Sequence, residues 1–176
     1  MRTLSAQELD QAHGRAIAMS PDFYSVEESW AAAHRAFVAV QIGGSVLDQE
    51  LAERYVSRLA ALGETSVYVV SHDGDTLPPT GLVTSVAPGD FIRGVLEMSW
   101  TNYCVLPVHE DGPSVLVTDR DYRLLVGDRI SLASLSDSLL EDRRDFLSLL
   151  DLPDTLGFRD THVQVAQQTA WLASTA

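Results

Sequence analysis

The sequence predicts an α+β fold: a central antiparallel sheet, built as a meander, with N-terminal and C-terminal helices packed on it. Most helix-start signals occur towards the two ends of the chain, and short apolar or alternating runs separated by turn residues fill the middle. Three of these runs are joined by tight turns, which favours antiparallel pairing. We expect a single domain over residues 1–176, with the helices on one face of the sheet.

Three helices are expected before the first strand, over residues 8–19, 28–40 and 49–62. The first two each begin with a capping box, in which a hydroxyl accepts a backbone amide and a glutamate three residues later bonds back. Apolar residues that recur every three or four positions predict that the second helix extends to residue 40. The residues that start or stop these helices are Ser5 and Glu8, Ser25 and Glu28, Asp48, and Gly63.

The middle of the chain contains the expected strands. Residues 65–72 and 81–86 form two of them, and 102–110, 113–119 and 122–128 form the meander. The meander turns are Asp111–Gly112 and Arg120–Asp121. Segment 90–100 fits either a short helix capped by Asp90 or a strand broken at Gly94.

Helix signals return at the C-terminal end. A third capping box, Ser138-x-x-Glu141, starts a helix that Pro153 closes, and residues 160–176 form one more helix. We see no internal repeat, low-complexity tract or interdomain linker.

Composition and charge limit the class of protein. With 45% hydrophobic and 21% charged residues, the chain is typical of an ordinary globular protein. It shows no signal peptide, no membrane-spanning run and only one cysteine, Cys104, so we expect a cytoplasmic protein without disulfides. All twelve basic residues are arginine, against 25 acidic residues, and the net charge is −13. Such a charge repels nucleic acid and anionic lipid and favours basic partners, although acidity also serves solubility alone.

No metal site or catalytic site is expected. The clusters at 72–75 and 109–111 lack zinc spacing, and neighbouring strand residues such as His109 and Glu110 point to opposite faces. Asp119 and Asp121 are expected to pair locally with Arg120 and Arg123. Cys104 lies in an apolar run as a small buried hydrophobe. Nucleophile motifs and phosphate-binding glycine loops are absent from the sequence, so we expect no enzyme and no cofactor.

The size, the acidity, the lack of a catalytic signature and the meander SWTNYCVLPVHEDGPSVLVTDRDYRLLVGD together resemble bacterial toxin-immunity proteins. The resemblance is to the immunity factors of NAD(P)-hydrolysing toxins, which are NAD glycohydrolases. The lysine-free composition, rich in Arg, Ala and Asp, is typical of an actinobacterium. The resemblance implies a one-to-one complex with a cognate toxin domain, in which this protein occludes a basic dinucleotide cleft.

A loop that carries acids, with an aromatic anchor where one is available, is the expected contact. The candidates are the Asp73-to-Asp75 turn, the Asp90–Phe91 approach and Glu110–Asp111. Two other classes stay open: a small acidic regulatory or interaction domain without a toxin partner, and a metal-dependent hydrolase that uses His109, Asp119 and Asp121.

Overall fold

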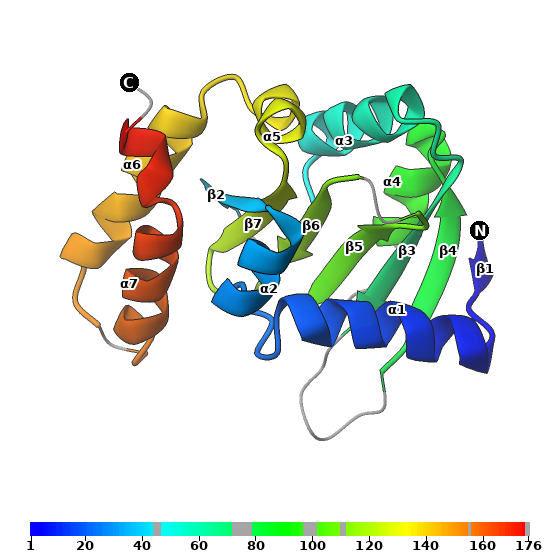
Figure 1. The fold of residues 1–176 in the computed structure, drawn as a ribbon, viewed down its shortest axis with the longest axis horizontal. Helices are drawn as coiled ribbons and strands as arrows, with labels where there is room; N and C mark the ends of the chain where they lie inside the picture. Colours follow the sequence, from blue (N-terminus) through cyan, green and yellow to red (C-terminus); the bar gives the residue numbers. More distant parts are fainter. Residues whose placement is uncertain (44–46, 72–78, 97–101, 110–111, 155, 175–176) are drawn as a thin grey trace.

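A computed structural model describes residues 1–43, 47–71, 79–96, 102–109, 112–154 and 156–174 (Figure 1). Its centre is one seven-stranded sheet with the strand order β1-β4-β3-β5-β6-β7-β2, and every neighbouring pair is antiparallel. The strands are β1 (Arg2–Thr3), β2 (Phe37–Ile42), β3 (Ser66–Ser71), β4 (Gly81–Ser85), β5 (Tyr103–Pro107), β6 (Ser114–Val117) and β7 (Tyr122–Gly127). None of the helices in the described ranges has the length and apolar character needed to cross a membrane.

The expected α+β architecture is confirmed, and so is the meander. Strand β6 lies between β5 and β7, with Cys104 opposite Leu116 and Leu116 opposite Leu124. The expected strands at 65–72 and 81–86 correspond to β3 and β4, which pair with each other.

Helices cover both faces of the sheet, so the expectation that they lie on one face is wrong. Alternate residues of β3 point to two separate cores, Val67 and Val69 to one and Tyr68 and Val70 to the other. Helices α3 (Gln49–Ala61), α4 (Pro88–Leu96) and α5 (Arg129–Leu135) contribute to the first core. Helices α1 (Ala6–Met19), α2 (Glu28–His34) and α7 (Arg159–Gln168) pack on the second. Because the central strands are apolar on both sides, one layer of helices would leave half of that surface in water.

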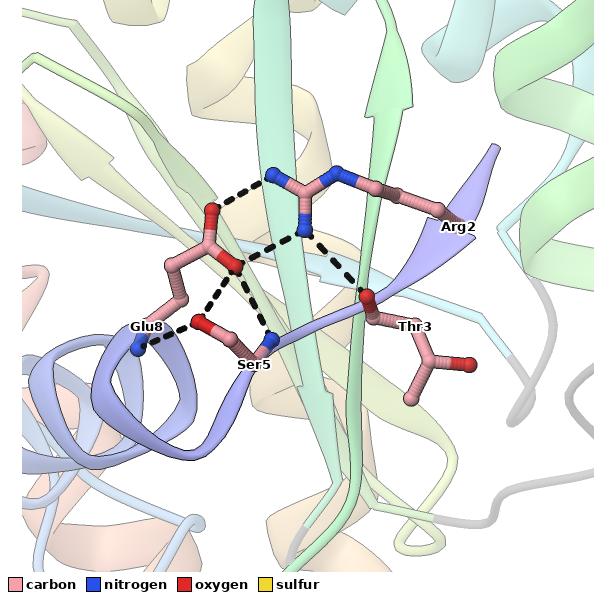
Figure 2. A network of polar contacts seen from close by, with 4 residues as sticks. All are labelled: Arg2, Thr3, Ser5 and Glu8. Atoms are coloured by element: carbon pink, nitrogen blue, oxygen red, sulfur yellow. Dashed lines mark hydrogen bonds and ion pairs between the residues drawn. The ribbon is translucent and has the colours of Figure 1, made fainter.

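The first capping box forms as predicted (Figure 2). Glu8 N–H donates to Ser5 Oγ at 3.4 Å, and Ser5 N–H donates to the Glu8 carboxylate at 2.9 Å. Arg2, on β1, adds an ion pair to Glu8 at 2.5 Å and ties the edge strand to the start of α1. Hydrogen bonds from Arg2 and then Ser5 hold the pKa of the Glu8 carboxyl well below its usual range. The predicted cap of α3 is also present, since Asp48 accepts from Leu51 N–H at 2.8 Å, and Gly63 has a φ of +85° after its end.

The second predicted helix is wrong over its C-terminal half. Helix α2 ends at His34, Arg35 takes a left-handed conformation with φ of +51°, and residues Phe37–Ile42 form β2. The β-branched residues of FVAVQI pair along the whole of β7, a non-local partner that a helical stripe cannot reveal. Ser25 does not cap α2, because its amide and hydroxyl bond to the Asp22 carboxylate instead.

The remaining helices differ from the predicted ones in number and in their bounds. The ambiguous segment 90–100 contributes to α4, and α5 was not anticipated, although Asp128 caps it through Ile130 N–H and Ser131 N–H. Ser138 starts α6 (Leu139–Ser148), which runs into the 3-10 helix η2 (Leu149–Asp151) before Pro153. The predicted last helix is split into α7 and the 3-10 helix η3 (Ala170–Ser174).

Strand β2 is an edge of the sheet, and the C-terminal helices cover it. Helix α6 lies beside β2 (Figure 1), and its Asp142 accepts a hydrogen bond from Gln41 Nε2 at 2.9 Å. Trp171 of η3 donates its indole N–H to the Val38 carbonyl at 2.7 Å. An uncovered edge strand offers unpaired backbone groups to other chains, and these contacts shield part of that edge at β2.

We predict that Trp171→Phe lowers the free energy of unfolding by about 1–3 kcal/mol, because the Val38 carbonyl loses a buried donor while an aromatic ring still packs on Phe37. Urea unfolding followed by circular dichroism measures the change. Leu156→Ala is the control, since Leu156 is 72% exposed and its loss should change stability by no more than about 0.5 kcal/mol. Equal effects of the two substitutions would contradict the role given to the indole.

Candidate functional site

Six carboxylates line one groove at the start of α3 and α6. The groove encloses about 280 Å³, and Gln41, Arg54 and the loop between α5 and α6 complete its walls. We call it the acidic groove and define it by its carboxylates: Asp48, Glu50, Asp137, Glu141, Asp142 and Asp145. The acids come from two parts of the chain that are far apart in sequence and are brought together only by the fold.

Local structure places each of these acids. Asp48 is the N-cap of α3, and Glu50 lies in the first turn of that helix. Glu141 and Asp142 occupy the first turn of α6, where the helix dipole favours negative charge. Asp142 also accepts from Ser136 Oγ at 2.5 Å and from Gln41, so its position is fixed from two sides.

Arg54 shows how the groove holds a guanidinium. Its Nη2 lies 2.6 Å from Glu50 Oε1 and 2.8 Å from Asp137 Oδ1. Hydrogen bonds to Asp137 and Glu50 raise the pKa of Arg54, which stays charged. Asp137 and Glu50 nevertheless remain 85% and 72% exposed, so both are accessible to a partner.

A second arginine, Arg123, binds one of the groove carboxylates. Arg123 on β7 is buried and its Nη1 lies 2.8 Å from Asp48 Oδ2. The side chain runs so close to Gly43 that a Cβ there would lie 2.0 Å from Arg123 Nη2, so any larger residue at 43 would displace the guanidinium. The expected local pairing of Asp119 and Asp121 with Arg120 and Arg123 is therefore not what the structure shows. Arg123 binds Asp48, and Arg120 stacks on Tyr24 and Phe158 at 3.5 Å and 4.3 Å.

Of the contact residues expected from the sequence, the structure describes only Asp90 and Phe91. Asp73, Asp75, Glu110 and Asp111 lie outside the described residues. Asp90 is exposed in the first turn of α4, whereas Phe91 is fully buried with its ring 5.8 Å from that of Tyr55. In this position Phe91 is part of the core and offers no exposed aromatic surface.

The residues of the hydrolase alternative do not converge. Asp119 and Asp121 line a cavity of about 260 Å³ with His162, but His109 binds elsewhere. Its backbone N–H and its Nδ1 lie 2.8 Å and 3.0 Å from the carboxylate of Glu64. Within the described ranges, no group of three or more His, Cys, Asp or Glu side chains is arranged to hold a metal ion.

His162 lines that cavity, and its surroundings shift the pKa of its imidazole. Its ring packs edge-on against Tyr122, Phe146 and Phe158. Burial, and next the positive charge of Arg120, lower the pKa of His162, with Asp154 and Asp121 opposing them. The neutral imidazole therefore serves packing in this position.

Comparisons with models of known protein families, with characterised proteins and with solved structures found no match.

Because folding lowers the pKa of His162, we predict that stability falls as the pH drops. The unfolded chain takes up this proton near pH 6.5, about the ordinary value, and the folded chain does so only at lower pH. Stability is therefore complete above that pH, is lost as the pH falls through it, and levels off below the folded pKa. Thermal unfolding between mildly acidic and neutral pH measures this loss. His162→Gln should flatten the dependence, and an unchanged slope in the variant would assign the effect to other groups.

We also predict that Asp145→Asn does not destabilise the protein. Asp145 lies four residues after Glu141 on α6, and two like charges at that spacing cost about 0.2–0.5 kcal/mol. The variant should gain up to this amount at low salt and nothing at high salt, as measured by chemical unfolding. Asp160→Asn is the matched comparison, because Asp160 lies in the first turn of α7 and its loss should lower stability slightly. A clear destabilisation by Asp145→Asn would give that carboxylate a structural role.

Proposed function

We propose that this protein is a cytoplasmic immunity protein that binds a toxin with a basic cleft in a one-to-one complex and inhibits it. The observation that carries the proposal is the acidic groove, which six carboxylates line together with Arg54. The resemblance to immunity factors of NAD(P)-hydrolysing toxins supplies the identity of the partner. The protein itself would perform no catalysis and need no cofactor or metal.

The charge of the protein supports rapid encounter with such a partner. A net charge of −13 attracts a basic surface over a distance of about 10 Å or less at physiological salt. Attraction between exposed charges of this kind raises the association rate and selects partners more than it adds affinity.

The groove itself supports recognition of arginine. Glu50 and Asp137 already hold the guanidinium of Arg54 at hydrogen-bond distance. Asp145 and Glu141 are exposed beside them on α6. A basic side chain from a partner would meet the same kind of carboxylate geometry, and charge-assisted bonds of this type are the strong ones in protein interfaces.

Inhibition follows from the chemistry of the substrate. A cleft that binds a dinucleotide pyrophosphate is lined by positive groups. Carboxylates that pair with those groups compete with the pyrophosphate and block its entry. Such competition needs no contact with the reacting bond, so it predicts full loss of hydrolysis at an equimolar ratio when binding is tight.

The first test needs a candidate toxin, and the genes that neighbour this one are to be searched for an NAD(P)-hydrolysing domain. Purified toxin and this protein are mixed at increasing ratios, and NAD⁺ hydrolysis is followed. We expect hydrolysis to stop at one-to-one stoichiometry and the two chains to elute together. Unchanged hydrolysis with co-elution would favour the regulatory or interaction domain, and unchanged hydrolysis without co-elution would reject the proposal.

A charge-neutral variant tests the surface. Asp137→Asn, Glu141→Gln and Asp145→Asn together remove three groove carboxylates and should weaken binding of the toxin by about tenfold or more, mostly at low salt. The control removes the same charge elsewhere through Glu28→Gln, Asp151→Asn and Asp160→Asn, all of which are exposed and outside the groove. Calorimetric titration of both variants gives the result. An equal loss in both would mean that net charge alone, and not the groove, carries the binding.

A further inference from the structure

An apolar pocket adjoins the acidic groove, between α5, the start of α6 and η3. It encloses about 390 Å³, enough for a large side chain of a partner. The groove and the pocket share residues 136–138, the loop between α5 and α6, so they form one continuous surface. We call the second part the α5–α6 pocket and define it by its lining outside the shared loop: Arg129, Ala133, Leu139, Leu140, Trp171 and Leu172.

The first turn of α6 contributes to both parts of this surface. Leu139 and Leu140 line the α5–α6 pocket. The next two residues, Glu141 and Asp142, line the acidic groove. Successive residues of a helix point in directions about 100° apart, so a single turn places apolar side chains on one side of the loop and carboxylates on the other.

The wall that α5 contributes to the pocket is open to solvent. Ala133 is exposed and lies four residues after Arg129, on the same side of the helix. Ile130 lies three residues before Ala133 and is 72% exposed. Burial of this apolar surface against a partner would be favourable, so the wall favours an apolar contact.

The groove has carboxylates that remain available to a basic partner. Asp48 and Asp142 are held by Arg123 and Gln41, and Asp137 lies 2.8 Å from Arg54 Nη2. Glu141 and Asp145 are exposed. Within the described ranges, neither of these two carboxylates has a hydrogen-bond or ion-pair partner. A guanidinium or ammonium group that enters the groove therefore meets at least two uncommitted acids.

The α5–α6 pocket carries the opposite charge. The guanidinium of Arg129 lies over the rings of Phe37 and Trp171, 4.5 Å and 5.3 Å from their centroids. Asp137 borders the pocket as well, but Arg54 already binds its carboxylate on the groove side. A basic side chain is thus attracted to the groove and repelled from the pocket, where an apolar side chain is favoured.

From the continuity of the groove and the pocket, and from their different chemistry, we infer that together they bind one segment of a protein partner. An arginine or lysine of that segment lies in the acidic groove, and a large apolar side chain close to it in sequence lies in the α5–α6 pocket. The inference rests on the proposed function, since it describes the segment by which a toxin is recognised.

The apolar half of the site accounts for affinity that the acids do not supply. Exposed ion pairs contribute little to binding, because both partners are well solvated and salt screens them. An apolar anchor that fills a pocket next to them excludes water and contributes more. A basic surface without an apolar side chain at the right place fills only half of the site, which makes the choice of partner more specific.

Selection of short random peptides displayed on phage, with the full chain immobilised, identifies the recognised segment without a toxin. We expect the enriched sequences to share an arginine or lysine and a leucine, isoleucine or aromatic residue at one fixed spacing. Enrichment of basic sequences without an apolar position, or no enrichment over the bare support, would overturn the inference.

A substitution in the pocket tests where an enriched peptide binds. Ala133→Gln places a longer, polar side chain in the pocket at an exposed helix position, and should weaken the peptide by about tenfold or more in calorimetric titration. Ala60→Gln is the matched control, because Ala60 is exposed on α3 and lines neither part of the site. Thermal unfolding checks that both variants fold alike. Unchanged affinity in Ala133→Gln would overturn the inference.

The same pair of variants separates the inference from the proposed function. If the unaltered protein inhibits a toxin and Ala133→Gln inhibits it equally well, the inhibition stands and the two-part site is wrong. If the peptides bind as expected and no toxin is inhibited, the two-part site stands as a binding site for a basic and apolar segment, and the proposed function is wrong.

Discussion

The central strands are apolar on both faces, and most of the fold follows from the need to cover both. Val67 and Val69 of β3 belong to one core and Tyr68 and Val70 to the other, and β5 divides in the same way between Val105 and its neighbours Cys104 and Leu106. Burial of this surface is the main favourable term in folding. To bury both faces, the sheet needs helices on each face. This need explains why helical segments lie before and after the strands in the chain and also between them.

The helix starts that serve this packing also create the acidic groove. Acids near a helix N-terminus stabilise the helix, and Asp48, Glu50, Glu141 and Asp142 all occupy such positions. The starts of α3 and α6 lie around the same groove. Each acid stabilises its own helix, but the acids of the two helices repel one another. Asp137 and Asp145 add to the repulsion without a helix-start role. This surplus of negative charge is the physical basis for our proposal that the groove binds a basic partner.

Local signals in the sequence predicted the fold well, and non-local contacts account for what was missed. The capping box at Ser5, the cap at Asp48 and the meander depend on neighbouring residues, and all are confirmed. Phe37–Ile42 has a helical stripe as well as strand propensity, and only its pairing with β7 decides between them. The acidic groove was not predicted because its acids converge from two distant segments. The spacing of Glu141, Asp142 and Asp145 along one helix was the signal available in the sequence.

The covering of β2 by α6 and Trp171 has a consequence for how the chain is made. Strand β2 leaves the ribosome well before its pairing partner β7, and the helices that shield its outer edge emerge later than β7. An early, apolar strand with no neighbour on either side is prone to association with other chains. The nascent protein therefore passes through a stage in which β2 is exposed, and that stage ends only when synthesis of the C-terminal segment is complete.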